Sequence, residues 1–176
     1  MPIFGPKALA IAAGLLACSC PTLRAETAWD SASADFAKVC VASLLDNDAL
    51  PAALRARELA PQQTGAFGAG WDGVAYSSKD GDRGITINHQ TYSDLKITHC
   101  IRIALVAASR SDFESLRQQL EAHPKIGKLE GKIVEAAPTV KLAMLKRPGN
   151  SPVVTFNFTS TATATTLNMN RWDIGQ

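Results

Sequence analysis

Residues 95–107 read Leu-Lys-Ile-Thr-His-Cys-Ile-Arg-Ile-Ala-Leu-Val-Ala, and this stretch decides the fold. Aliphatic residues recur there at every second position, with His99 as the single polar residue in their row. A two-residue period of this kind predicts a β-strand with a buried face. Cys100 points to the opposite side of the same strand. We therefore expect both faces to be covered, which makes this a central strand of its sheet.

Working outward, the other segments predict antiparallel strands joined by short turns. Five more stretches alternate in the same way: residues 71–78, 83–90, 140–144, 154–158 and 167–172. The Asp80-Gly81 pair between the first two is a hairpin signal. Residues 131–135 have only weak strand character, and residues 62–70 read as a Gly- and Ala-rich loop. Two three-strand meanders separated by a helix give a hint of an internal repeat.

Three segments have helical character. Residues 31–46 place apolar side chains on one face at helical spacing, with Ser31 or Ser33 as the expected N-cap. Pro51 suits the first turn of a short helix over residues 52–59. Ser111 and Glu114 have the spacing of a capping box, which predicts a helix ending near residue 122. The fold class is therefore α+β: an antiparallel sheet of about six strands with an N-terminal helix and one mid-chain helix packed on it.

The first 25 residues differ from the rest and predict a secretory signal peptide. They contain one cation, Lys7, before a short apolar run over residues 8–17 that is too short to span a bilayer. Residues 26–176 would then form a single exported domain, periplasmic or secreted. The alternative is a lipoprotein box ending at Cys18, which would carry a lipid anchor. No later segment is long and apolar enough for a membrane span.

Removal of this leader changes the charge of the chain. The full sequence has 18 basic and 16 acidic side chains, and two of the basic ones, Lys7 and Arg24, lie in the leader. The remaining domain has a formal net charge of zero. No basic field remains to attract nucleic acid or an anionic membrane, so we expect no nucleic-acid partner.

Two cysteines, Cys40 and Cys100, follow the leader. In an exported chain a disulfide between them is the expected state, and it would tie the first helix to the central strand. In the chain-entropy description a loop of about 60 residues stabilises the fold by about 4 kcal/mol. The alternative is a pair of buried free thiols.

Catalytic and metal-binding signatures are weak. The three histidines lack the spacing of a zinc motif, and the sequence contains no Gly-x-Ser-x-Gly nucleophile pattern. His99 and Cys100 are neighbours on a strand, so their side chains point apart and do not form a dyad. We expect no cofactor and no metal. One alternative remains, a small periplasmic hydrolase or metal-dependent enzyme that uses His89, Asp94 and His99.

The leading functional hypothesis is a non-catalytic binding or envelope accessory module whose partner is an unknown protein or a small apolar ligand. Two features favour binding over chemistry. Aromatic residues lie near the ends of the expected elements: Trp29, Trp71, Tyr76, Tyr92 and Trp172. The Thr-rich residues 159–166 would form a polar, exposed strand edge, through which the chain would pair as a homodimer.

Overall fold

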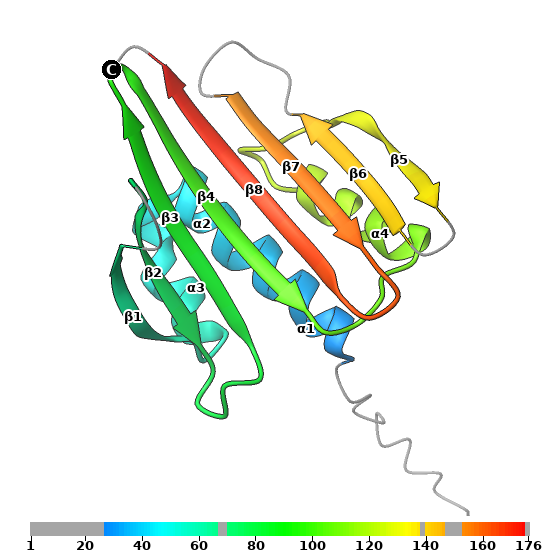
Figure 1. The fold of residues 1–176 in the computed structure, drawn as a ribbon, viewed down its shortest axis with the longest axis horizontal. Coiled ribbons are helices and arrows are strands. Elements are labelled where there is room, and N and C mark those ends of the chain that lie inside the picture. Colours follow the sequence, from blue (N-terminus) through cyan, green and yellow to red (C-terminus); the bar gives the residue numbers. More distant parts are fainter. Residues whose placement is uncertain (1–26, 67–69, 138–139, 147–152, 175–176) are drawn as a thin grey trace, which may run out of the picture.

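A computed structural model describes residues 27–66, 70–137, 140–146 and 153–174. Its strands form one antiparallel sheet, and the described helices lie together on one face of that sheet (Figure 1). The α+β class, with the N-terminal and mid-chain helices on an antiparallel sheet, is confirmed. The expected leader, with Cys18 in it, lies outside the described residues.

The N-terminal helix begins earlier than expected and contains one π-helical turn. It runs through α1 (Ala28–Asp35), η1 (Phe36–Cys40) and α2 (Val41–Leu45). Its N-cap is Thr27: the Thr27 hydroxyl accepts from the Asp30 amide at 3.1 Å, and the Asp30 carboxylate accepts from the Thr27 amide at 3.2 Å. A short 3-10 turn, η2 (Asn47–Ala49), leads into α3 (Leu50–Ala56), which has a proline in its first turn as expected.

The sheet has eight strands in the order β1-β2-β3-β4-β8-β7-β6-β5. All six expected strands are present, and two further strands, β1 and β5, form the edges. The bounds are β1 (Ala60–Ala66), β2 (Asp72–Ser77), β3 (Gly84–Tyr92), β4 (Leu95–Ala104), β5 (Glu130–Ala137), β6 (Val140–Lys146), β7 (Val153–Ser160) and β8 (Thr165–Ile174). The stretch that decides the fold is β4, and it is central as predicted.

The chain divides into two halves with the same element order. In the first half the N-terminal helix precedes β1 to β4, and in the second half α4 (Arg110–Glu121) precedes β5 to β8. The last strand of each half pairs with the other, because β4 lies antiparallel to β8 along their full lengths. The two meanders seen in the sequence are therefore four-stranded, and their last strands form the seam between the halves.

The core lies between the helices and the sheet. Phe158 on β7 is at its centre, with its ring 5.7 Å from that of Phe36 on η1 and 5.6 Å from that of Phe113 on α4. Trp29 packs against the outer side of Phe113 at 5.8 Å. Helix α4 therefore covers the same face as the N-terminal helix.

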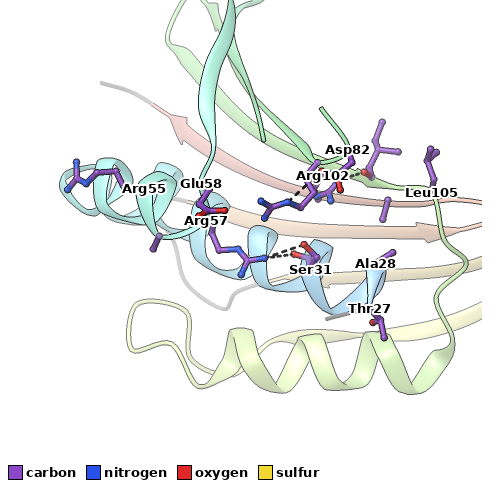
Figure 2. A pocket seen from close by; sticks show the side chains of 13 residues that line it. Thr27, Ala28, Ser31, Arg55, Arg57, Glu58, Asp82, Arg102 and Leu105 are labelled. Atoms are coloured by element: carbon purple, nitrogen blue, oxygen red, sulfur yellow. Dashed lines mark hydrogen bonds and ion pairs between the residues drawn. The ribbon is translucent and has the colours of Figure 1, made fainter. Parts of the chain in front are cut away.

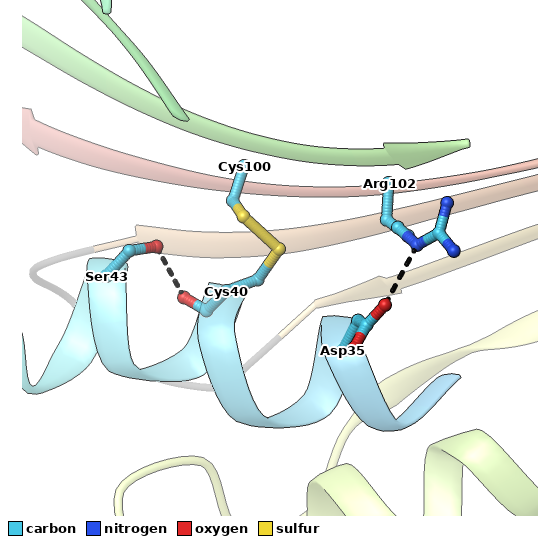
Figure 3. The surroundings of a disulfide bond; sticks show 5 residues. All are labelled: Asp35, Cys40, Ser43, Cys100 and Arg102. Atoms are coloured by element: carbon cyan, nitrogen blue, oxygen red, sulfur yellow. Dashed lines mark hydrogen bonds and ion pairs between the residues drawn. A yellow bond between two sulfur atoms is a disulfide. The ribbon is translucent and has the colours of Figure 1, made fainter. Parts of the chain in front are cut away.

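The predicted disulfide is present between Cys40 and Cys100 (Figure 3). Both cysteines are fully buried, and the bond joins η1 to β4 across the core. An intramolecular disulfide of this kind is typical of proteins in oxidising compartments. Because it places Cys100 on the helix-covered face, His99 and the aliphatic residues of β4 lie on the other face.

That other face, which we call the open face, corrects the expectation that both sides of β4 are covered. Ile103 on β4 is 54% exposed, and Leu105 just beyond the strand is 89% exposed. Helix α4, which contains Phe113, packs on the opposite side and therefore does not cover this face. The reason is the register: Ile101 has Thr86 and Asn168 as its neighbours on β3 and β8, so the aliphatic row of β4 is flanked by polar rows.

Three local expectations are also wrong. Helix α4 is capped two residues earlier than predicted, because the Ser109 hydroxyl accepts from the Asp112 amide at 3.2 Å and the Asp112 carboxylate accepts from the Ser109 amide at 2.7 Å. The expected loop over residues 62–70 is in part the edge strand β1. The Thr-rich segment forms the turn between β7 and β8, which are interior strands, so it is not a sheet edge.

Within the described residues, every helix is too short or too polar to cross a lipid bilayer.

Candidate functional site

The three residues of the hypothetical enzyme are not brought together. His89 lies opposite Thr98 on the helix-covered face, and its Nδ1 is 3.1 Å from the Thr98 hydroxyl. Asp94 is exposed in the turn between β3 and β4, whereas His99 lies on the open face. Among the described residues, no group of three His, Cys, Asp or Glu side chains is placed to hold a metal ion.

Neighbouring strands instead surround His99 with amides. The register places Asn88 of β3, His99 of β4, Asn170 of β8 and Thr155 of β7 in one row across the open face. In the next row Ile101 lies beside Asn168, which pairs with a further asparagine on β7. Each residue comes from a different strand, so the row exists only because all four strands have this register.

Two tryptophans flank the same histidine. The ring centroid of Trp71, immediately before β2, is 4.4 Å from that of His99 in an edge-on arrangement. The centroid of Trp172 on β8 is 6.5 Å from His99 on the other side. Ile97 pairs with Trp172 and is only 5% exposed, although it lies on the open face. The indoles therefore form an apolar strip beside the amide row.

We define the open-face patch by six residues: Trp71, Asn88, His99, Asn168, Asn170 and Trp172. Its unusual property is that four of its polar atoms are buried and make no hydrogen bond of ordinary geometry within the described part of the chain, although the side chains of His99 and Asn170 lie close enough to interact. These atoms are Asn88 Oδ1, His99 Nε2, Asn168 Oδ1 and Asn170 Oδ1. The Asn170 amide nitrogen does have a partner, since it donates to the Thr155 hydroxyl at 3.2 Å.

Unpaired buried polar groups are rare in folded proteins, and each one costs free energy. Two more such atoms occur among the described residues, on Asp35 and Arg102, and those two groups face each other as an ion pair. The open-face patch is therefore the place where hydrogen-bonding capacity is concentrated and unused. Three of its four unpaired atoms are carboxamide oxygens, which accept hydrogen bonds.

The patch is electrically neutral. Burial lowers the pKa of His99 below its ordinary value, and a side-chain hydrogen-bonding interaction with Asn170 opposes that shift only in part. A neutral imidazole presents one donor and one acceptor nitrogen. The other members of the patch are asparagines and tryptophans, which carry no charge. A ligand held here meets hydrogen-bonding groups and indole rings, with no charged group to neutralise.

A glycine makes the close packing around Asn88 geometrically feasible. Gly73 on β2 pairs with Asn88 on β3. A Cβ at position 73 would overlap the Ile87 carbonyl oxygen and the Asn88 Oδ1, and would lie 2.9 Å from the Asn88 Cα. The missing side chain at position 73 therefore leaves the space in which the Asn88 carboxamide lies.

Sequence reasoning found parts of this patch and missed its assembly. Both tryptophans were identified as candidate contacts near element ends, and His99 was identified as a polar interruption in an apolar row. Asn88 and the pairing of His99 with Asn170 were missed, because they depend on the register between β3, β4 and β8. The available signal was the Leu-Asn-Met-Asn alternation of β8 at residues 167–170, in which large apolar residues mark the core face.

Comparison with known proteins gives no relative: no family model, no curated protein and no solved structure matches this chain.

Proposed function

We propose that this chain is an exported, non-catalytic binding module whose open-face patch holds a neutral saccharide. The observation that carries this proposal is the neutral row of asparagine amides and His99, with unpaired polar atoms in it, beside two indole rings. These atoms have almost no exposed surface, so binding would require the side chains that cover them to move, and a ligand that then donates hydrogen bonds to them would recover the free energy lost by leaving them unpaired.

The chemistry of the patch favours hydroxyl groups. Three carboxamide oxygens, on Asn88, Asn168 and Asn170, need donors, and a hydroxyl group can both donate and accept. A sugar ring also has an apolar face of C–H groups, which suits the surface of an indole such as Trp71. This combination of donors with one apolar face distinguishes a saccharide from a purely apolar ligand, for which the amide oxygens would remain unpaired.

The neutrality of the patch supports an uncharged ligand. The patch has no guanidinium or ammonium group to pair with an anion and no carboxylate to pair with a cation. Hydrolysis of a saccharide would ordinarily require two carboxyl groups on either side of the scissile bond. Because His89 lies on the face opposite His99 and Asp94 lies in the turn between β3 and β4, the patch is better suited to holding a ligand than to cleaving it.

Export is part of the proposal and has separate support. The first 25 residues predict a leader, and the Cys40–Cys100 disulfide is typical of an oxidising compartment. A neutral saccharide of the cell envelope or its surroundings would be accessible to such a protein. The sequence offers a lipid anchor at Cys18 as another way of holding the module in place, and a homodimer through a sheet edge would have to use β1 or β5, because the Thr-rich segment is not an edge.

The test is isothermal titration of the disulfide-bonded domain with neutral oligosaccharides, selected first on an array of uncharged glycans. Trp71→Ala and Asn168→Leu should each weaken binding by about tenfold, through loss of the ring surface and of one acceptor. Tyr92→Ala is the control: Tyr92 is 53% exposed and lies on the same face at the end of β3, but it is not one of the six patch residues.

Binding of a neutral sugar should also be insensitive to salt, because no charge is screened. Absence of any saccharide ligand would refute the proposal. So would binding that Tyr92→Ala weakens as much as Trp71→Ala does. Turnover of the bound sugar would overturn the non-catalytic part alone.

A further inference from the structure

A cavity of about 670 Å³ lies on the helix-covered side at the end of β4. It is enclosed by the first turns of α1, the residues that follow α3, the β2–β3 turn and the last residues of β4 (Figure 2). Its lining is strongly charged, with four arginines and two acidic residues: Arg55, Arg57, Arg83, Arg102, Glu58 and Asp82. This is a separate place from the open-face patch, which lies across the sheet.

One buried carboxylate organises the cationic wall. Asp35, the last residue of α1, has a side chain with no exposed surface. The Arg57 Nε donates to Asp35 Oδ1 at 2.6 Å, and the Arg57 guanidinium also reaches Ser31 on α1, as Figure 2 shows. Arg83 and Arg102 approach the same carboxylate at longer distances, 3.6 Å from Arg83 Nη1 to Oδ1 and 3.4 Å from Arg102 Nε to Oδ2.

The charges at this cluster do not balance. Three guanidinium groups meet one aspartate, and arginine remains protonated at any ordinary pH. The nearest additional carboxylate, Asp82, is 3.8 Å from Arg83 Nε with a side chain that is 65% exposed, so water weakens its effect. Glu58 is also exposed, on the lining of the same cavity. Among the described residues, the cavity lining and Asp35 therefore hold four guanidinium groups and three carboxylates, an excess of one positive charge, and Arg57 has further contacts besides Asp35.

Arg102 is the least solvated of these cations. Its side chain is only 5% exposed and projects from β4 toward α1 (Figure 3). Burial lowers the pKa of Arg102, Asp35 opposes that effect, and the nearby charge of Arg83 adds to it. A buried cation with an incomplete set of counter-charges is unfavourable unless a further anion is supplied.

The N-terminus of α1 also borders the cavity, through Thr27, Ala28 and Ser31. The Asp30 carboxylate already caps this helix end and offsets its dipole, so the positive character of the cavity comes from the guanidinium groups. Guanidinium groups pair with carboxylate and phosphate oxygens through parallel N–H donors.

We propose that this cavity binds an oxyanion group, a phosphate or a carboxylate, through Arg83 and Arg102. The ligand would supply the negative charge that Asp35 alone does not. The contrasting interpretation is that the arginines serve only to fasten α1 to β4 and to the β2–β3 turn. That interpretation predicts no response to oxyanions beyond the effect of ionic strength.

The experiment is titration of the disulfide-bonded domain with inorganic phosphate and, separately, with acetate, each at an ionic strength held constant with sodium chloride. Calorimetry would measure the affinity and thermal unfolding the accompanying rise in Tm. Arg83→Gln is the informative variant, since Arg83 makes the longest contacts in the cluster and its loss should disturb the fold least. Arg110→Gln is the matched control, because Arg110 pairs with Glu114 on the exposed surface of α4.

We expect phosphate or acetate to raise Tm in the natural chain and in Arg110→Gln. Arg83→Gln should weaken that binding by about tenfold or more, the effect of losing one charged hydrogen-bond partner. If Arg83→Gln fails to fold, Arg83→Lys keeps the charge without the planar fork and should weaken binding in part. Stabilisation by phosphate alone or acetate alone would identify the ligand class. No response to either, or an equal response in Arg83→Gln, would overturn the proposal.

Discussion

The Cys40–Cys100 disulfide should provide a large share of the stability of this fold. Replacing both cysteines by alanine opens a loop that spans a sequence separation of 60 residues. In the chain-entropy description, this loss costs about 4 kcal/mol in the free energy of unfolding. Both side chains are fully buried, and truncating them removes packing worth about 1 kcal/mol each by comparison with a buried methylene group. The expected total is about 5–6 kcal/mol, or a fall in Tm of about 10–20 °C.

The assay is urea unfolding of three samples: the oxidised protein, the same protein after reduction, and the Cys40→Ala/Cys100→Ala double variant. Reduction removes only the cross-link and should cost about 4 kcal/mol, and the double variant should lose the further packing contribution. Titration of the native protein for thiols, in denaturant, should find none at Cys40 or Cys100. Two free thiols, or a double variant within about 1 kcal/mol of the oxidised protein, would refute the reasoning.

Three further predictions concern the two candidate sites. Gly73→Ala should lower the free energy of unfolding in urea by about 1–3 kcal/mol, because the added Cβ overlaps Asn88. Gly84→Ala is the control and should change that free energy by less than about 0.5 kcal/mol, because its added Cβ would lie 3.5 Å from the nearest atom. Asp35→Ala should cost about 3–5 kcal/mol in the same assay, because it leaves buried guanidinium groups without their carboxylate; a loss below about 1 kcal/mol would contradict that view. Burial lowers the pKa of His99 in the folded state, so the unfolded chain binds the proton more readily, and stability should fall as pH drops from about 7 to about 5. His99→Gln should flatten that part of the stability–pH curve. Burial also lowers the pKa of His89, so His89→Gln should act in the same direction.

The elements with strong alternation could be predicted from the sequence because their pattern is local. β4 and β7 show the two-residue period plainly, and the pairing of Cys40 with Cys100 follows from there being two cysteines after the expected leader. The edge strands β1 and β5 could not be predicted in the same way. The seven residues of β1 are all exposed, so no apolar alternation marks it.

The position of the α4 cap shows a different limit. Two overlapping serine patterns lie in the sequence, one from Ser109 to Asp112 and one from Ser111 to Glu114. Both offer a hydroxyl and a carboxylate at the spacing of a capping box. The structure uses the earlier pattern, and the Ser111 hydroxyl lies 2.8 Å from that of Ser109. Local chemistry allows both starts, and the docking of the helix on the sheet decides between them.

The open face could not be predicted from β4 alone, and the reason is physical. An aliphatic row on one strand indicates a buried face only when the neighbouring strands continue that row. Here the rows beside Ile101 are polar, at Thr86 and Asn168. The core row instead runs from Cys100 to Met169 on β8 and on to Phe156 on β7. Burial is thus a property of the row across the sheet, which the register sets and a single strand does not reveal.

The same strand explains why the molecule offers two chemically different sites. On β4, His99 and Arg102 are three residues apart and therefore point to opposite faces. The disulfide fixes which face is which, because it holds Cys100, and with it Arg102, against the helices. His99 is thereby left on the face without helices, beside neutral amides and indoles, while Arg102 is enclosed with excess positive charge. A one-residue slip in the register of β4 would turn both side chains to the other face, taking the guanidinium away from Asp35 and placing the imidazole on the helix-covered side. The cross-link to η1 is therefore a determinant of both sites as well as of stability.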